Sequence, residues 1–165
     1  MYFNMIKIFV TGGTFDKDYD EKNGRLYFKK THMNEILKLG RSKVDVNIET
    51  LMMLDSLDMN ENDRKLIIEK CTNSKENHIV ITHGTDTMTD TAMDLGQRKL
   101  NKTIVLTGAM IPYKFGTSDG LFNIASALAY VQTLTKGVYV AMNGRVFTYD
   151  KVLKNKDTGI FEEVI

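Results

Sequence analysis

The stretch HIVITHGTDT, residues 78–87, decides the fold. Its first half, HIVIT at 78–82, is a continuous apolar, mostly β-branched run, which is typical of a strand buried on both faces of a parallel sheet. Its second half is rich in glycine, threonine and aspartate, which favour loops. The stretch therefore predicts a central strand that ends directly in a polar loop.

The same pattern occurs on both sides of this stretch. MIKIFVT at 5–11 runs into TGGT at 11–14, and TIVL at 103–106 runs into TGAM at 107–110. A further apolar run, VYVAM at 138–142, precedes an Asn-Gly turn. Ligands of parallel sheets bind beyond the carboxyl ends of the strands, so we expect the three polar loops to share one rim of the sheet.

Helical spacing of apolar residues lies between these strands. Alternating strands and helices predict an α/β fold, a doubly wound, mainly parallel sheet with helices on both faces. Among the other elements, we expect an exposed-face strand at 43–51, a polar loop at 150–159, and helices at 31–39 (with Thr31 as N-cap), 60–74, 87–98 (with Met93 inward) and 120–133 (capped by 118–119).

Composition narrows the class of protein. With 165 residues, 42% of them hydrophobic, the chain is expected to form one domain over residues 1–165. Twenty-two basic against 21 acidic residues give a net charge of +1, which argues against nucleic-acid or membrane binding. No apolar stretch approaches the ~20 residues of a membrane span, and the first residues resemble a buried strand more than a signal peptide. We therefore expect a cytoplasmic protein.

The loops carry groups that can perform chemistry. Thr14 could act as a covalent nucleophile if a base takes its proton, and Tyr19 and Tyr27 are nearby candidates for that role. A second set consists of Thr85, with Asp86 and Lys154, because a desolvated lysine held by an aspartate can serve as a base. The alternative is that TGGT is only a tight turn and that Lys154 is one of many solvated lysines.

Other chemistries fit the sequence less well. It has no G-x-x-x-x-G-K-[ST] loop and no G-x-G-x-x-G after its first strand, which argues against nucleotide binding. His83 has no G-x-S-x-G partner motif, so we expect a buried histidine bonded to the backbone. The three histidines lack metal-ligand spacing, and the single Cys71 excludes an internal disulfide. We expect no metal and no cofactor.

Taken together, TGGT at 11–14, ITHGTDTM at 81–88, GAM at 108–110 and SDG at 118–120 resemble the bacterial-type L-asparaginases. The resemblance covers almost the whole chain. It implies hydrolysis of the side-chain amide of L-asparagine, and sometimes glutamine, to the acid and ammonia through a threonine-linked acyl-enzyme, without cofactor.

The resemblance also assigns roles to single residues. Thr14 matches the nucleophile, Tyr19 in DKDY at 16–19 matches the loop tyrosine that assists it, with Tyr27 as rival, and Thr85 matches the threonine partnered by Lys154. The remaining matches are to groups that bind the substrate. These are Asp86 for the α-ammonium, Ser56 for the α-carboxylate, and Gly84 and the backbone around Ala109, the latter as part of the oxyanion pocket.

The chain departs from the family pattern in several places. Leu57 stands where full-length members carry a glutamine beside the serine, Phe15 follows TGGT in place of a small aliphatic residue, and His78 replaces a small residue. Full-length members continue into a second domain, so a short, one-domain member is expected here, and the resemblance implies a homo-oligomer, a dimer or tetramer. The alternatives are a glutaminase, an amidase that supplies ammonia to a larger complex, and a catalytically silent domain that binds an amino acid.

Overall fold

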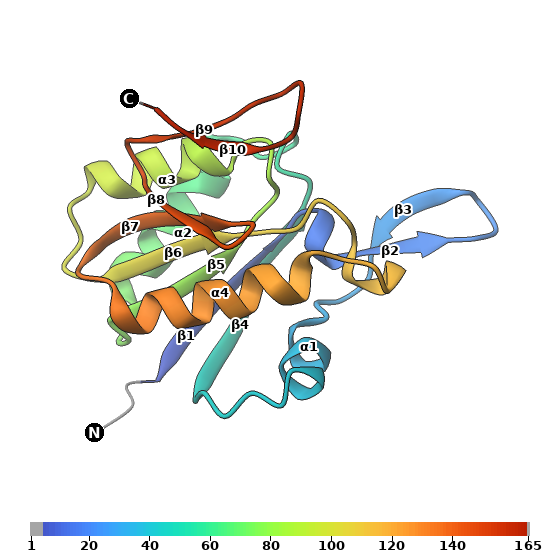
Figure 1. Ribbon diagram of the computed structural model, residues 1–165, viewed down its shortest axis with the longest axis horizontal. Coiled ribbons are helices and arrows are strands. Elements are labelled where there is room, and N and C mark those ends of the chain that lie inside the picture. The colour runs from blue at the N-terminus through green and yellow to red at the C-terminus, as the bar shows by residue number, and fades with distance from the viewer. Residues whose placement is uncertain (1–4, 165) are drawn as a thin grey trace.

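The computed structural model describes residues 5–164 and is built around one six-stranded sheet (Figure 1). The strand order is β4-β1-β5-β6-β7-β8, and every neighbouring pair is parallel except β7 with β8. The five parallel strands thus lie in the order 2-1-3-4-5, which reverses between β1 and β5. The strands are β1 (Ile6–Gly12), β4 (Val46–Leu54), β5 (His78–Thr82), β6 (Thr103–Thr107), β7 (Gly137–Met142) and β8 (Arg145–Thr148).

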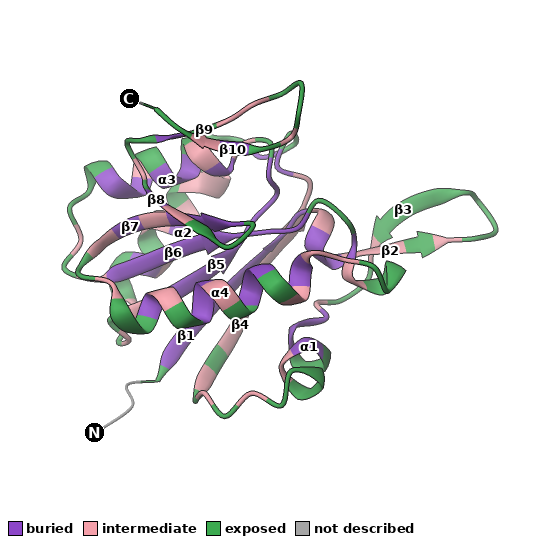
Figure 2. Ribbon diagram, viewed as in Figure 1, coloured by how far each residue is buried: buried purple, intermediate pink, exposed green. Residues whose placement is uncertain are grey.

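Both faces of the sheet are covered by helices, as predicted. Successive side chains of a strand point to opposite faces, so Ile8 and Val10 of the fully buried β1 enter one core while Phe9 enters the other. Figure 2 shows the resulting buried centre of the sheet. One core is closed by α1 (Met33–Leu39) and α4 (Gly120–Thr133), and the other by α2 (Glu61–Asn73) and α3 (Met88–Gln97).

The helices begin close to the predicted positions. In α2, the Asn60 side chain accepts hydrogen bonds from the amides of Asn62 and Asp63, and the Asp63 carboxylate accepts from the Asn60 amide, which completes a capping box. The N-cap of α1 is His32, so the prediction of Thr31 was wrong by one residue. Thr31 still accepts a hydrogen bond from the amide of Met33 at 3.2 Å.

Two polar segments form hairpins that the sequence did not predict. One consists of β2 (Lys17–Asp20) and β3 (Arg25–Phe28) and projects from the body of the molecule (Figure 1). The other pairs β9 (Val152–Lys154) with β10 (Phe161–Glu163), where a loop was expected. This second hairpin is anchored because Val152 and Phe161 are buried in the core under α3.

Two further expectations need correction. The strand predicted at 43–51 begins and ends three residues later. Met93 is not inward but 37% exposed, since the buried face of α3 is formed by residues at i, i+4 and i+7, namely Met88, Ala92 and Leu95.

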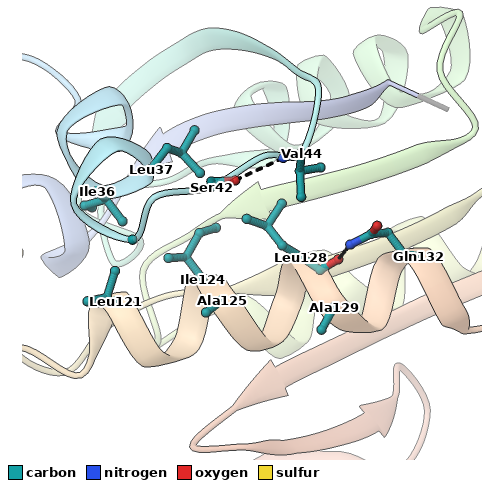
Figure 3. Close-up of a pocket in the computed structure, with 11 residues that line it drawn as sticks. Ile36, Leu37, Ser42, Val44, Leu121, Ile124, Ala125, Leu128, Ala129 and Gln132 are labelled. Atoms are coloured by element: carbon teal, nitrogen blue, oxygen red, sulfur yellow. Dashed lines mark hydrogen bonds between the residues drawn. The ribbon is translucent and has the colours of Figure 1, made fainter. Parts of the chain in front are cut away.

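Between α1 and α4 lies an apolar hollow of about 240 Å³, shown in Figure 3. Its walls include Ile36, Leu121 and Leu128, and no ionisable side chain lines it. It therefore has no groups for acid–base chemistry, and the candidate site lies elsewhere. Within residues 5–164, no helix has the length and apolar character needed to cross a membrane.

Candidate active site

The loops after β1 and β5 meet where the strand order reverses, as the shared-rim prediction requires. A β-carbon on Gly13, whose φ is 73°, would lie 2.5 Å from the Cα of Gly84, so the two backbones touch and only glycine fits. A β-carbon on Gly84 would in turn lie 2.6 Å from the side chain of Ser56, in the loop after β4. This contact places Thr14, the next residue after Gly13, beside the loop that carries Thr85.

Thr14 begins a short 3₁₀ turn, η1 (Thr14–Asp16), directly after β1. Its side chain is half-buried, while the following Phe15 is buried in the core between the sheet and α4. The large Phe15 therefore anchors the turn and leaves the Thr14 hydroxyl at the rim.

Thr85, Asp86 and Lys154 come together in the structure. The Lys154 ammonium donates to Thr85 Oγ1 at 2.9 Å and to Asp86 Oδ1 at 2.6 Å, although Lys154 lies about 70 residues further along the chain. Lys154 stands on β9, paired with Phe161 of β10, and not in the expected loop. The β9–β10 hairpin thus delivers a largely buried lysine to the buried Thr85 and the more exposed Asp86.

His83 is buried and uses both ring nitrogens, which confirms the expectation from sequence. Nδ1 lies 2.8 Å from the Gly84 carbonyl, which can only accept, so Nδ1 carries the proton and Nε2 accepts from Thr91 Oγ1 at 2.8 Å. Burial lowers the pKa of His83 to about 4. A neutral imidazole therefore supports the loop that holds Gly84 and Thr85.

Ser56 is buried behind this loop. Its hydroxyl accepts a long hydrogen bond of 3.4 Å from the Thr87 amide, and its carbonyl accepts from Thr87 Oγ1 at 2.9 Å. The neighbouring Leu57 is 71% exposed. The serine is thus held against the Thr85 loop, while Leu57 offers no polar group.

The loop after β6 is braced by a residue whose role the sequence did not reveal. The Asp119 carboxylate accepts hydrogen bonds from the amides of Met110 and Ile111 at 3.0 Å, and Asn123 donates to the Gly108 carbonyl at 2.9 Å. Asp119 was expected only to cap α4. Since the Met110 and Ile111 amides are already engaged, they are not free to bind an oxyanion beside Ala109.

The two candidate tyrosines lie on opposite faces of the β2–β3 hairpin, because Tyr19 pairs with Leu26 and Tyr27 pairs with Asp18. The Tyr19 ring is 55% exposed and packs edge-on against Phe115 with ring centres 6.4 Å apart. Among the described residues, neither tyrosine is hydrogen-bonded to Thr14. The structure therefore does not bring Tyr19 together with the other candidate catalytic groups.

A cavity of about 750 Å³ opens beside Lys154 and Asp86. Charged and apolar groups share its lining, with Leu57, Met110 and Leu153 exposed at its rim. In the part of the chain that the structure describes, no cluster of three or more histidine, cysteine or acidic side chains could hold a metal ion. The cavity thus suits a small polar ligand with both charges.

The fold and these groups define a doubly wound α/β protein with a threonine-, lysine- and aspartate-bearing site at its switch point. The chain belongs to the asparaginase family of hydrolases, since the family model "Asparaginase, N-terminal" matches residues 5–161.

Three similar proteins place the chain within this family. It is 33% identical to L-asparaginase 2 of Escherichia coli, covering 94% of this chain and 47% of that protein. It is also 33% identical to one component of the glutamyl-tRNA(Gln) amidotransferase of Methanococcus vannielii, covering 94% and 37%. The crystal structure of a probable cytoplasmic L-asparaginase from Campylobacter jejuni superposes with a TM-score of 0.83 at 29% identity, covering 97% and 53%. The chain spans about half the length, or less, of these relatives.

Proposed function

We propose that this chain hydrolyses the side-chain amide of L-asparagine to L-aspartate and ammonia, through an acyl-enzyme on Thr14. The observation that carries the proposal is the Lys154 ammonium bonded to Thr85 and Asp86, next to the contact between the Thr14 and Gly84 loops. Similarity to proteins named L-asparaginases supports this substrate.

Recognition of the substrate follows from its two charges. The α-ammonium of a free amino acid requires an anion, and Asp86 is exposed toward the cavity with one carboxylate oxygen on Lys154. The α-carboxylate requires donors, and the Ser56 hydroxyl, which accepts from Thr87, keeps its own proton to donate. Leu57 adds no donor, so this carboxylate has fewer contacts than a glutamine there would allow.

The proposed chemistry has two steps. Thr14 Oγ attacks the amide carbon, its proton passes through Tyr19 to the leaving nitrogen, and ammonia departs as the C–N bond breaks. Water then attacks the ester carbon, with Thr85 and Lys154 handling its proton, and releases aspartate and a free Thr14 hydroxyl. We assign Tyr19 over Tyr27 because the Tyr19 ring contacts Phe115 in the segment that follows Ala109.

Negative charge that develops on the amide oxygen needs preorganised donors. Backbone amides of the glycine-rich loops, at Gly84 and Ala109, are the groups we assign to this role. Loss of one such donor typically costs about 3–4 kcal/mol of barrier lowering.

A second candidate is an amidase that releases ammonia from glutamine for a larger complex. Similarity to an amidotransferase component favours it, and the cavity is large enough for the longer side chain. The ratio of kcat/KM for asparagine and glutamine, measured on the same preparation, separates the two. A silent amino-acid-binding domain is the third alternative, and it predicts binding without ammonia release.

We also propose that residues 1–165 act as one domain, in the cytoplasm, and that copies assemble into a dimer or tetramer. Exposed apolar side chains at the cavity rim, Leu57, Met110 and Leu153, support assembly, since such groups are commonly covered by a partner. Light scattering coupled to size exclusion gives the mass in solution, and a monomer at all concentrations would contradict assembly.

The decisive experiment measures ammonia release by the purified chain and by Thr14→Ala. Thr133→Ala, an exposed threonine near the end of α4, is the matched control. We expect release by the wild type and the control but not by Thr14→Ala. Asparagine binding without ammonia release by the wild type would refute the hydrolase, and full activity of Thr14→Ala would refute the nucleophile.

A further inference from the structure

Polar atoms are buried without a partner beside the β2–β3 hairpin. Within the described part of the chain, five buried side-chain nitrogen or oxygen atoms lack a hydrogen bond, and three of them belong to Asp16 and His32. His32 is 2% exposed, its Nε2 lies 3.2 Å from Oδ1 of Asp18 without hydrogen-bond geometry, and its Nδ1 lies 3.8 Å from a carboxylate oxygen of Glu35. Burying such groups is costly, so their position needs an explanation other than packing alone.

Asp16 and Asp18 connect both ends of the candidate machinery to His32. The Asp16 carboxylate, in the same turn as Thr14, accepts from the His32 amide at 2.8 Å and from Thr31 Oγ1 at 3.1 Å. Burial raises the pKa of Asp16, which shows how little solvent reaches this point. Asp18 lies on β2, one residue before Tyr19. The segment that leads from Thr14 to Tyr19 is thus tied to the start of α1.

The second 3₁₀ turn, η2 (Tyr113–Phe115), meets the same group of residues. The Tyr113 ring lies 5.8 Å from the His32 ring, Lys114 forms an ion pair of 3.0 Å with Glu35, and Phe115 packs against Tyr19. This turn follows the loop braced by Asp119. The loops after β1 and β6 and the hairpin therefore converge on His32.

We propose that His32 is a positioning residue that fixes the β2–β3 hairpin and η2 so that Tyr19 reaches Thr14 when substrate is bound. The proposal rests on the proposed function for the role of Tyr19. His32 does not touch the reacting atoms. It acts through the hairpin, whose only other tie to the body described here, the Lys17–Asp55 ion pair, lies at the beginning of β2.

Limited trypsin digestion tests the anchoring independently of activity. The hairpin carries cleavable residues at Lys22 and Arg25, and a folded hairpin resists cleavage. We expect His32→Leu, which fills the space but cannot pair, and His32→Gln to raise the cleavage rate at these two residues about tenfold or more at a temperature where both stay folded. The control His78→Gln, at the opposite end of β5, should leave this rate unchanged. Unchanged cleavage in both folded His32 variants would overturn the proposal.

A kinetic cycle tests whether His32 acts through Tyr19. Misplacing a catalytic group by about 1 Å can cost up to about 100-fold in rate, so we expect His32→Gln to lower kcat about tenfold or more with KM nearly unchanged. In a Tyr19→Phe background the same change should have almost no further effect on kcat. An undiminished effect in that background would refute action through Tyr19. If the wild type releases no ammonia, the proposed function fails while the digestion still decides the anchoring.

Discussion

At the scale of single residues, Lys154 connects the second threonine with an acid. As an ammonium, it donates to Thr85 and leaves the Thr85 hydroxyl proton free for water or a leaving nitrogen. Lys154→Met should lower kcat by about 10²–10⁴-fold, the usual contribution of a positioned proton-transfer group.

The control for this prediction is Lys151→Met, an exposed lysine just before β9. It should retain wild-type ammonia release and the wild-type circular dichroism spectrum. A kcat for Lys154→Met within threefold of the control would show that the lysine is only structural.

His83 makes stability depend on pH. The folded protein keeps this imidazole neutral down to about pH 4, because burial lowers its pKa, whereas the unfolded chain takes up a proton near pH 6.5. Its contribution is therefore complete above pH 6.5 and is lost as the pH falls toward 4, with a slope of at most about 1.4 kcal/mol per pH unit. Urea denaturation of wild type and His83→Gln across this range should show a smaller slope for the variant, and parallel curves would contradict this account.

Sequence reasoning located the residues whose motifs directly follow strands, and it missed those defined by the tertiary structure. The positions of Thr14 and Thr85 at one rim follow from strand order alone. Asp119 braces a neighbouring loop instead of capping α4 with its side chain, and the burial of His32 depends on η2 and the hairpin. No local pattern encodes such contacts, because their partners lie far away in the chain.

At the scale of secondary-structure elements, Gly96 controls how α3 packs on the segment after β8. A β-carbon there would lie 2.3 Å from the ring of Tyr149, so Gly96→Ala must displace the ring or the helix. Overpacking of this kind costs about 1–3 kcal/mol, which outweighs the helix propensity gained.

Gly40→Ala is the matched control, since Gly40 has ordinary right-handed helical dihedrals and its nearest contact would be 3.4 Å away. Thermal denaturation should show a clear drop in Tm for Gly96→Ala and little change for Gly40→Ala. Equal melting temperatures would mean that Tyr149 moves aside without cost.

The elements that sequence predicted well have strong periodic patterns, and the two hairpins do not. HIVIT at 78–82 and the helix at 120–133 were predicted at their observed bounds. The β2–β3 strands are polar and largely exposed, so they show no alternation of apolar residues. In β9–β10, single buried residues such as Val152 and Phe161 hold the hairpin, which is too sparse a signal to predict a strand.

At the scale of the whole molecule, a ligand that binds only the folded state should raise its stability. L-Aspartate, the proposed product, should raise the Tm of Thr14→Ala in a concentration-dependent way, by about 2.7 kcal/mol in free energy at 100 times Kd. Asp86→Ala should abolish the shift, since the α-ammonium loses its counter-ion. An equal shift with succinate, which has no ammonium, would show that Asp86 does not recognise that group.

The position of β1 in the sheet also has a consequence for how the protein folds. Residue 6 of β1 pairs with residue 46 on one side and residue 78 on the other, both in parallel register. Parallel pairing between such distant segments pays loop-closure entropy before any contact rewards it, and it forms late and slowly. Because Thr14 and Thr85 meet only across β1 and β5, no early, locally structured intermediate can hold the two threonines together, and the site comes into existence only with the completed sheet.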